Sequence, residues 1–507
     1  MSMIREEADG RVELTGDLSG SPLYNHDLAP TPIASRTWRA ANLAGLWVAM
    51  CLCIPTYQMA SGLIAVGMNV GQAILTILLG NLIVLVPILL NSHPGTRYGI
   101  PFPVFARAAY GTAGANLPAL MRALVACGWF GINAWIGGLA LNTMIKAFWP
   151  GWVAWGGTPG GYPAGQWLAF LAFWGLNMVV VFRGMEALRR FGNVSAVLVL
   201  MMTFGLYFWT VKETGSWGPG LTAGGKLDGM AAFLPVFIPS LTAIIGFWAT
   251  LSLNMPDFTR FAASQKDQVR GQVASLPAAM VAFSTLGILI TSQSGVLYGK
   301  EIWDPIALVD KLGNPWVIAL ATFTIALATT SVNVAANVVS PANDFAHVWP
   351  SRIDFRKGAL ITGVLGIVIQ PWRLLSDASA YIFDWLGFYA GGLGAVAGVL
   401  IWDYWVLRRN RLSLPDLYSP AGRYTYRAGW HPAALLATAF GCFLAWGGRW
   451  LPAMAPVVPY GWFAGFFGAA LAYHVLTRAH ALGQAVVAPD PGQGEPVGQP
   501  SLPPSDV

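Results

Sequence analysis

The sequence predicts an all-α integral membrane protein with about twelve transmembrane helices. Of its 507 residues, 55% are apolar and only 10% are charged, and the mean hydropathy is +0.55. A soluble protein carries roughly 25% charged residues. The charges here lie in short clusters between apolar runs long enough to cross a bilayer, which takes about 20 residues. We therefore expect a multi-pass protein of the cell membrane, surrounded by lipid, and the net charge of +6 does not indicate nucleic-acid binding.

The apolar runs divide the chain into three parts. Residues 1–37 are polar, include Glu6 and Glu7, and do not form a cleavable signal peptide. Residues 38–480 form the transmembrane domain, and residues 481–507, which are rich in Pro, Gly and Gln, are expected to be a disordered cytoplasmic tail. The predicted spans are 38–66, 71–91, 115–145, 165–183, 193–211, 232–254, 271–296, 314–338, 357–371, 379–404, 431–450 and 459–477.

The first ten spans fall into two stretches of nearly equal length, 38–211 and 232–404, followed by extra helices at 431–477. Each stretch contains an odd number of spans, so the second enters the membrane from the opposite side and any repeat is inverted. Eighteen lysines and arginines lie in loops on the N-terminal side and seven in loops on the other side. Because positive loops stay in the cytoplasm, both termini are predicted to be cytoplasmic.

The span that opens each repeat is interrupted near its middle. The first is broken at residues 51–58, which include Pro55, and the second is weakened at residues 246–250. Irregular backbone survives at membrane depth only where it is buried in protein or lines a cavity. A matching pair of broken spans is typical of the substrate site of a secondary transporter built from repeats.

The polar residues inside the spans are neutral. No Asp, Glu, Lys or Arg lies near a predicted midplane, which argues against a charged substrate and against an obvious carboxylate proton carrier. Amide side chains both donate and accept hydrogen bonds, which suits a heterocycle with its own N–H and C=O groups. The neutral residues are Thr56, Gln58, Asn133, Thr250, Thr329, Thr330, Ser331, Asn333 and Asn337.

Two pairs of these residues have helical spacing. Trp129 and Asn133 are four residues apart and share one helical face, where an indole and an amide could stack on and hydrogen-bond to a planar base. Asn333 and Asn337 share a face in the same way. The alternative for the first pair is ordinary helix packing beside glycines, and for the asparagines it is bonding to a neighbouring helix.

The sequence does not predict an enzyme. It contains no HExxH, GxSxG or Walker-type motif, and its six histidines lie in loops or near span ends. Its four cysteines lie inside apolar spans without zinc-ligand or disulfide spacing. We expect no cofactor and no metal other than a coupling ion.

Several motifs together resemble the nucleobase–cation-symport-1 family, whose fold is LeuT-like. The resemblance covers roughly residues 22–480 and implies five-plus-five inverted repeats with discontinuous helices 1 and 6. The motifs are residues 25–30, 36–38, 54–57, 98–102, 129–132 and 254–261, then Asn333 with residues 335–337 and 340–341, and finally residues 403–404.

The resemblance implies that the substrate is held between Trp129 and Trp248, while amides of helices 3 and 8 bind its edge. Asn337 matches the family's ligand-binding asparagine, and Asn333 is a further candidate. Asn133 stands where several relatives carry glutamine, which is one methylene longer.

Two positions differ from a hydantoin-transporting relative. Cys53 stands where that carrier has glutamine and some allantoin-type relatives have asparagine, and cysteine forms poor hydrogen bonds. Phe247 replaces a glycine of the hydantoin carrier and would narrow the pocket. The difference at Cys53 argues against hydantoin or allantoin as substrate.

The resemblance also implies a sodium site. Its ligands would be carbonyls of Ala49, Leu52 and Ala328 and two helix 8 hydroxyls, at Ser331 and Val332. Valine offers no oxygen, and a hard cation requires oxygen ligands. We therefore expect weak or absent sodium dependence, with proton coupling as the substitute.

The function predicted from the sequence is secondary active import of a neutral planar N-heterocycle, most simply a nucleobase of the uracil or cytosine type, by cation symport with alternating access. Allantoin or hydantoin uptake is the alternative within the same class. A membrane receptor or scaffold that binds ligand without transporting it is the alternative from another class. A monomer is expected.

Overall fold

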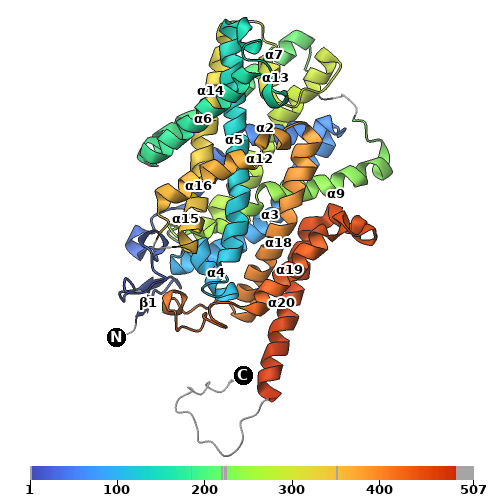
Figure 1. Cartoon of the computed structure of the whole chain (residues 1–507). Coiled ribbons are helices and arrows are strands. Elements are labelled where there is room, and N and C mark those ends of the chain that lie inside the picture. Colours follow the sequence, from blue (N-terminus) through green and yellow to red (C-terminus); the bar gives the residue numbers. More distant parts are fainter. Residues whose placement is uncertain (1–2, 184, 218–220, 222–224, 350–351, 487–507) are drawn as a thin grey trace, which may run out of the picture.

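The computed structural model describes residues 3–183, 185–217, 221, 225–349 and 352–486, and most of these residues are helical. The helices pack as a tall bundle, with the N-terminus and the small hairpin β1–β2 at one end and the short helix α13 at the other (Figure 1). Strand β1 (Ile4–Glu6) pairs antiparallel with β2 (Val12–Leu14).

The helices of the first repeat correspond to the predicted spans within a few residues at most ends. They are α1 (Ala40–Cys51), α2 (Ile54–Ala65), α3 (Val70–Tyr98), the short α4 (Phe102–Tyr110), α5 (Asn116–Phe148), α6 (Ala164–Arg183) and α7 (Met185–Thr214).

The second predicted stretch is also helical. It contains α9 (Gly229–Phe247), α10 (Ala249–Asn254), α11 (Pro256–Thr259), α12 (Gln265–Tyr298), α13 (Pro305–Val309), α14 (Pro315–Asn337), α15 (Val339–Val348), α16 (Phe355–Val368), α17 (Pro371–Leu374) and α18 (Gly387–Ile401). Two π-helical segments, Ala380–Leu386 and Trp402–Leu407, extend α18 at both ends. The extra helices are α19 (Pro432–Trp446) and α20 (Gly461–Val486).

Eight described segments, each a single helix or a run of adjoining helices, are long and apolar enough to cross a membrane. The bent pair α1–α2 makes a ninth span. The remaining three predicted spans correspond to α7, α16 and α19. Of these, α16 and α19 are only 14 and 15 residues long. The predicted tail lies largely outside the described residues.

Both predicted breaks are present. Helices α1 and α2 meet at an angle of 57°, and Pro55 lies in the first turn of α2, where its missing N–H leaves no helical hydrogen bond unmade. In the second repeat the helix is interrupted at a single residue, Trp248, between α9 and α10. The Trp248 amide bonds back only three residues, to the Ile245 carbonyl at 3.2 Å.

The helices around the breaks form two groups. Helices α1, α2, α3, α9 and α12 pack on one another as one group, and α5, α6, α14, α15 and α16 as a second. Helix α5 is 33 residues long and runs through the middle of the second group (Figure 1). Its Gly131 touches α16 so closely that an added Cβ would lie 2.1 Å from the Gly366 carbonyl oxygen.

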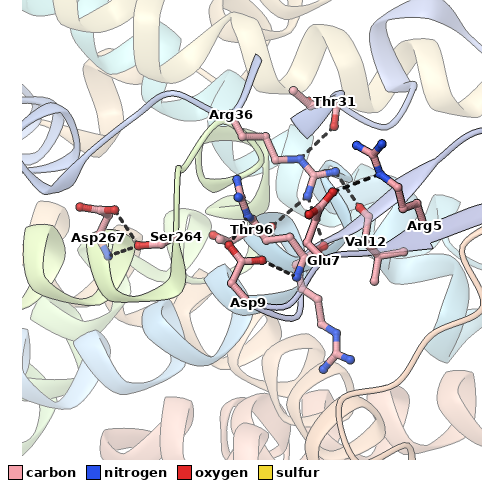
Figure 2. A network of polar contacts seen from close by, with 11 residues as sticks. Arg5, Glu7, Asp9, Val12, Thr31, Arg36, Thr96, Ser264 and Asp267 are labelled. Carbon is pink, nitrogen blue, oxygen red and sulfur yellow. Dashed lines mark hydrogen bonds and ion pairs between the residues drawn. The ribbon is translucent and has the colours of Figure 1, made fainter. Parts of the chain in front are cut away.

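Arg36 is one of the buried residues that hold the N-terminal segment against the helices. Arg36 is only 2% exposed and donates to carbonyls of Val12 (2.8 Å), Thr31 (2.9 Å) and Thr96 (3.2 Å), as Figure 2 shows. Burial lowers the pKa of Arg36 to about 10, so the guanidinium stays charged at neutral pH. These contacts hold β2 and the loop before α1 against the end of α3.

Candidate functional site

A narrow cavity of about 40 Å³ lies where the two breaks face α5 and α14. The broken helices contribute Cys53, Phe247 and Trp248, α5 contributes Trp129 and Asn133, and α14 contributes Asn337. Six of the seven substrate-contact residues predicted from the sequence therefore line one cavity. Its wall is completed by Met50, Pro55, Thr250, Leu251, Val332 and Ala336.

Three aromatic rings form one side of this cavity. The Phe247 ring centroid lies 5.2 Å from that of Trp129 and 4.9 Å from that of Trp248, and its plane is edge-on to both, at 76° and 83°. Phe247 thus joins the two indoles that were expected to sandwich the substrate. The position of the Phe247 ring between the two indoles is the reason to expect a narrower pocket.

Each indole is oriented by a hydrogen bond from its ring nitrogen. Trp129 Nε1 donates to the Tyr389 hydroxyl at 3.1 Å, and Trp248 Nε1 donates to Asn81 Oδ1 at 2.9 Å. Trp47 packs edge-on against Trp248 at 5.0 Å. The faces of both indoles therefore have fixed directions, while their nitrogens are already used.

Asn133 carries an unused hydrogen-bond acceptor. Its Nδ2 donates to the Trp129 carbonyl one turn earlier at 3.0 Å, whereas its Oδ1 is buried without a hydrogen-bond partner. An unpaired buried carbonyl costs free energy, and a ligand N–H in the cavity would satisfy it.

Asn333 is the predicted contact residue that does not reach the cavity wall. It is fully buried, and its Nδ2 donates to the Phe130 carbonyl and to Asn177 Oδ1, both at 3.3 Å. Its Oδ1 accepts from Asn337 Nδ2 at 3.1 Å. Asn333 thus stands behind Asn337 and orients it, which matches the alternative of bonding to a neighbouring helix.

The residues of the predicted cation site are divided between the first break and α14. The Cys53 amide, which would bond to the Ala49 carbonyl in a continuous helix, donates instead to the Cys51 carbonyl at 3.0 Å. Leu52 packs in the same apolar cluster as Ala328. Ser331 is buried, and Val332 lines the substrate cavity with an apolar side chain.

Sequence reasoning missed the residues that support the site from other helices. Met50 and Leu251 line the cavity, but the helix breaks separate them from Cys53 and Phe247, so helical spacing does not connect them. Tyr389 and Asn81 orient the indoles from α18 and α3, and no sequence pattern connects them to the tryptophans.

The family is shown by a sequence comparison. Residues 30–465 match the model of a family described as permeases for cytosine/purines, uracil, thiamine and allantoin. The chain belongs to this family. It is therefore a membrane permease and not an enzyme.

Two curated relatives share the same percentage identity with this permease, over alignments of different length. It is 41% identical over 468 residues to the allantoin permease of Bacillus subtilis (strain 168), which covers 90% of this chain and 94% of that protein. It is also 41% identical over 426 residues to the purine-uracil permease NCS1 of Arabidopsis thaliana, with 83% of this chain and 70% of that one covered.

The fold of this permease matches a solved transporter. The closed conformation of Mhp1, a nucleobase-cation-symport-1 family transporter with bromovinylhydantoin bound, aligns with a TM-score of 0.72 at 25% identity, over 90% of this chain and 96% of Mhp1. The inward-facing conformation of Mhp1 aligns with a TM-score of 0.73 at 24% identity, over 91% and 96% of the two chains. The five-plus-five inverted repeat with two discontinuous helices is thus confirmed.

Proposed function

We propose that this permease imports a small, neutral, planar N-heterocycle, with a nucleobase of the uracil or cytosine type as the first candidate. The observation that carries the proposal is the unpaired Oδ1 of Asn133 beside the faces of Trp129 and Trp248. A flat ring with an N–H at its edge would use both features at once. No charged side chain is among the residues that line the cavity, which suits an uncharged ligand.

Allantoin is the second candidate, and the favouring observation is the similarity to the Bacillus subtilis allantoin permease along 90% of this chain. Against it, Phe247 limits the width of the site, and allantoin carries a flexible ureido group on its ring. Cys53 at the cavity wall also offers a weaker hydrogen bond than an amide would.

The two candidates are separated by uptake into proteoliposomes of labelled uracil, cytosine, allantoin and hydantoin. We expect saturable uptake of one or more bases, with the apparent affinity weakened in Asn133→Ala and unchanged in Asn142→Ala, a half-buried amide on the same helix outside the cavity. Preferred uptake of allantoin would establish the second candidate. Saturable binding with no uptake of any compound would instead establish a receptor.

The sidedness and the coupling ion belong to the same proposal. The excess of positive loops on the N-terminal side supports a cytoplasmic location for both termini. Val332 supplies no oxygen beside Ser331, so sodium would lack one ligand there. Proton coupling with weak sodium dependence follows, and the substrate would enter through the end that carries α13.

A further inference from the structure

The connection between α12 and α14 packs on the second half of the first broken helix. Ser61 Oγ of α2 donates to the Trp303 carbonyl at 2.7 Å. The Trp303 ring lies nearly parallel to that of Tyr381, with centroids 6.2 Å apart, and Tyr381 donates to the carbonyl of Pro55 at 3.2 Å. Pro55 lines the substrate cavity, so this connection is linked to the cavity wall.

Asp304 is the ionisable residue of this contact. Its Oδ1 accepts from the Ile306 amide at 3.1 Å, which caps α13, and from Gln58 Nε2 of α2 at 3.4 Å. Asp344 and Asp403, by contrast, are buried beside the arginines Arg122 and Arg408. Among the described residues, no Lys, Arg or His nitrogen forms an ion pair with Asp304.

The lysines near Asp304 form ion pairs with other carboxylates. Lys226 pairs with Glu301 at 3.1 Å before the contact, and Lys146 of α5 pairs with Asp310 at 2.6 Å after α13. From α2 the titratable group that faces Asp304 is the buried phenol of Tyr57. Burial therefore raises the pKa of Asp304 above its ordinary value, and the hydrogen bonds from Ile306 and Gln58 only partly oppose this.

Gln58 has an unused acceptor at this contact. Its side chain is 2% exposed, its Oε1 is buried without a hydrogen-bond partner, and the distance from Nε2 to Asp304 is long. A carboxylate can only accept hydrogen bonds, whereas a carboxylic acid can also donate one. A protonated Asp304 could therefore form a two-way acid–amide pair with Gln58.

We propose that Asp304 and Gln58 form an external proton-binding site that stabilises the closed outer face of the permease. The proposal rests on the proposed transport function and orientation. Asp304 takes a proton from the outer solution as the connection docks on α2, and returns it to the same side when the connection lifts. The proton is not carried across the membrane, so the site regulates the rate of transport and does not supply its energy.

The sign of the effect follows from linkage. The closed form binds the proton more tightly than the open form, in which Asp304 is hydrated, so closure becomes easier as the external pH falls and harder as it rises. Transport limited by outer closure should therefore speed up by several-fold between mildly alkaline and mildly acidic external pH.

The test is substrate exchange in proteoliposomes at equal pH on both sides, so that no proton gradient contributes. Asp304→Asn should remove the acid stimulation and keep a high rate, because Asn can pair with Gln58 and is also a good helix N-cap. Asp310→Asn, at the other end of α13, is the matched control and should keep the wild-type pH profile. Parallel pH profiles for wild type and Asp304→Asn would overturn the proposal.

A second measurement separates this proposal from the transport mechanism. Accumulation driven by an inward proton gradient should persist in Asp304→Asn, since the coupling proton binds elsewhere. Loss of gradient-driven accumulation with intact exchange would overturn the regulatory role and make Asp304 the coupling site itself. If the wild-type protein exchanges none of the tested heterocycles, the proposed function fails first.

Discussion

Under the proposed function, Phe247 restricts the shape of the ligand. Its ring fills the corner between Trp129 and Trp248, so a ligand that stacks on either indole must also fit against its edge. A ring without bulky substituents meets this condition. The proposal assigns the polar part of recognition to Asn133 and Asn337, which line the same cavity.

Trp129→Ala should weaken substrate binding strongly. Loss of a base–aromatic stack costs about 1–3 kcal/mol, which corresponds to a roughly 5- to 150-fold rise in Kd. Binding can be measured by tryptophan fluorescence or calorimetry on detergent-solubilised protein. Trp135→Ala removes a buried tryptophan from the same helix outside the cavity, so it should lower thermal stability and leave Kd unchanged; an unchanged Kd in Trp129→Ala would refute the stacking role.

Val332→Thr should increase sodium dependence. The substitution adds a hydroxyl beside Ser331 and the carbonyls of the first break, and thereby supplies an oxygen ligand that sodium requires. Uptake with sodium chloride is compared with uptake in choline chloride for wild type, Val332→Thr and the control Val334→Thr. Strong sodium stimulation of the wild-type protein would contradict the expected role of Val332.

At the scale of elements, two backbones in contact fix α5 against α16. The Cβ that Gly131 lacks would lie 2.1 Å from the Gly366 carbonyl, and one added to Gly366 would lie 2.7 Å from the Phe130 ring. Small residues allow this close approach between transmembrane helices. The packing places Trp129 and Asn133 at a fixed depth in the bundle.

Gly131→Ala should destabilise the protein. Overpacking of a tight contact costs about 1–3 kcal/mol, and backbone atoms cannot move aside as a flexible side chain can. Gly175→Ala on α6 is the matched control, because its Cβ would meet no atom within 4 Å and alanine favours a helix over glycine by about 1 kcal/mol. Thermal unfolding in detergent should show a lower Tm for the first variant and no decrease for the second.

The positions of the helix breaks could be predicted from the sequence, whereas the contacts between distant helices could not. Proline and small residues located the interruptions near Pro55 and Trp248, because irregular backbone in a membrane needs a local cause. Helical spacing placed Asn333 and Asn337 on one face, but spacing does not reveal which helix covers that face. Asn333 bonds to α6. The roles of Tyr389 and Asp304 could not be predicted, because each role depends on contacts with residues distant in the sequence.

At the scale of the whole molecule, the N-terminal segment held by Arg36 lies at one end of the bundle and the connection that carries Asp304 and α13 lies at the other (Figure 1). Between these ends lies the cavity, bordered by both helix groups. Transport then requires that the α1–α2–α9 group and the α5–α14 group change their relative position, as related transporters with two discontinuous helices do.

The orientation can be tested with single cysteines introduced at exposed positions on the two ends. A membrane-impermeant maleimide added to intact cells should label Lys311→Cys and leave Ser19→Cys unlabelled, because the proposed orientation, which is based on the excess of positive loops, puts the N-terminal side in the cytoplasm. Permeabilised cells should show labelling of both variants. Labelling of only Ser19→Cys in intact cells would reverse the assignment.

The amides of Asn337, Asn333 and Asn177 have a consequence for how this permease could acquire a new substrate. They connect the cavity on α14 to the middle of α6 through two hydrogen bonds. A substitution at Asn177, which does not line the cavity, would leave Asn333 Nδ2 with the Phe130 carbonyl as its remaining acceptor. This weaker support for Asn333 would change the direction in which Asn337 presents its amide. Substitutions outside the cavity would therefore change substrate selectivity while every residue on the cavity wall stays the same.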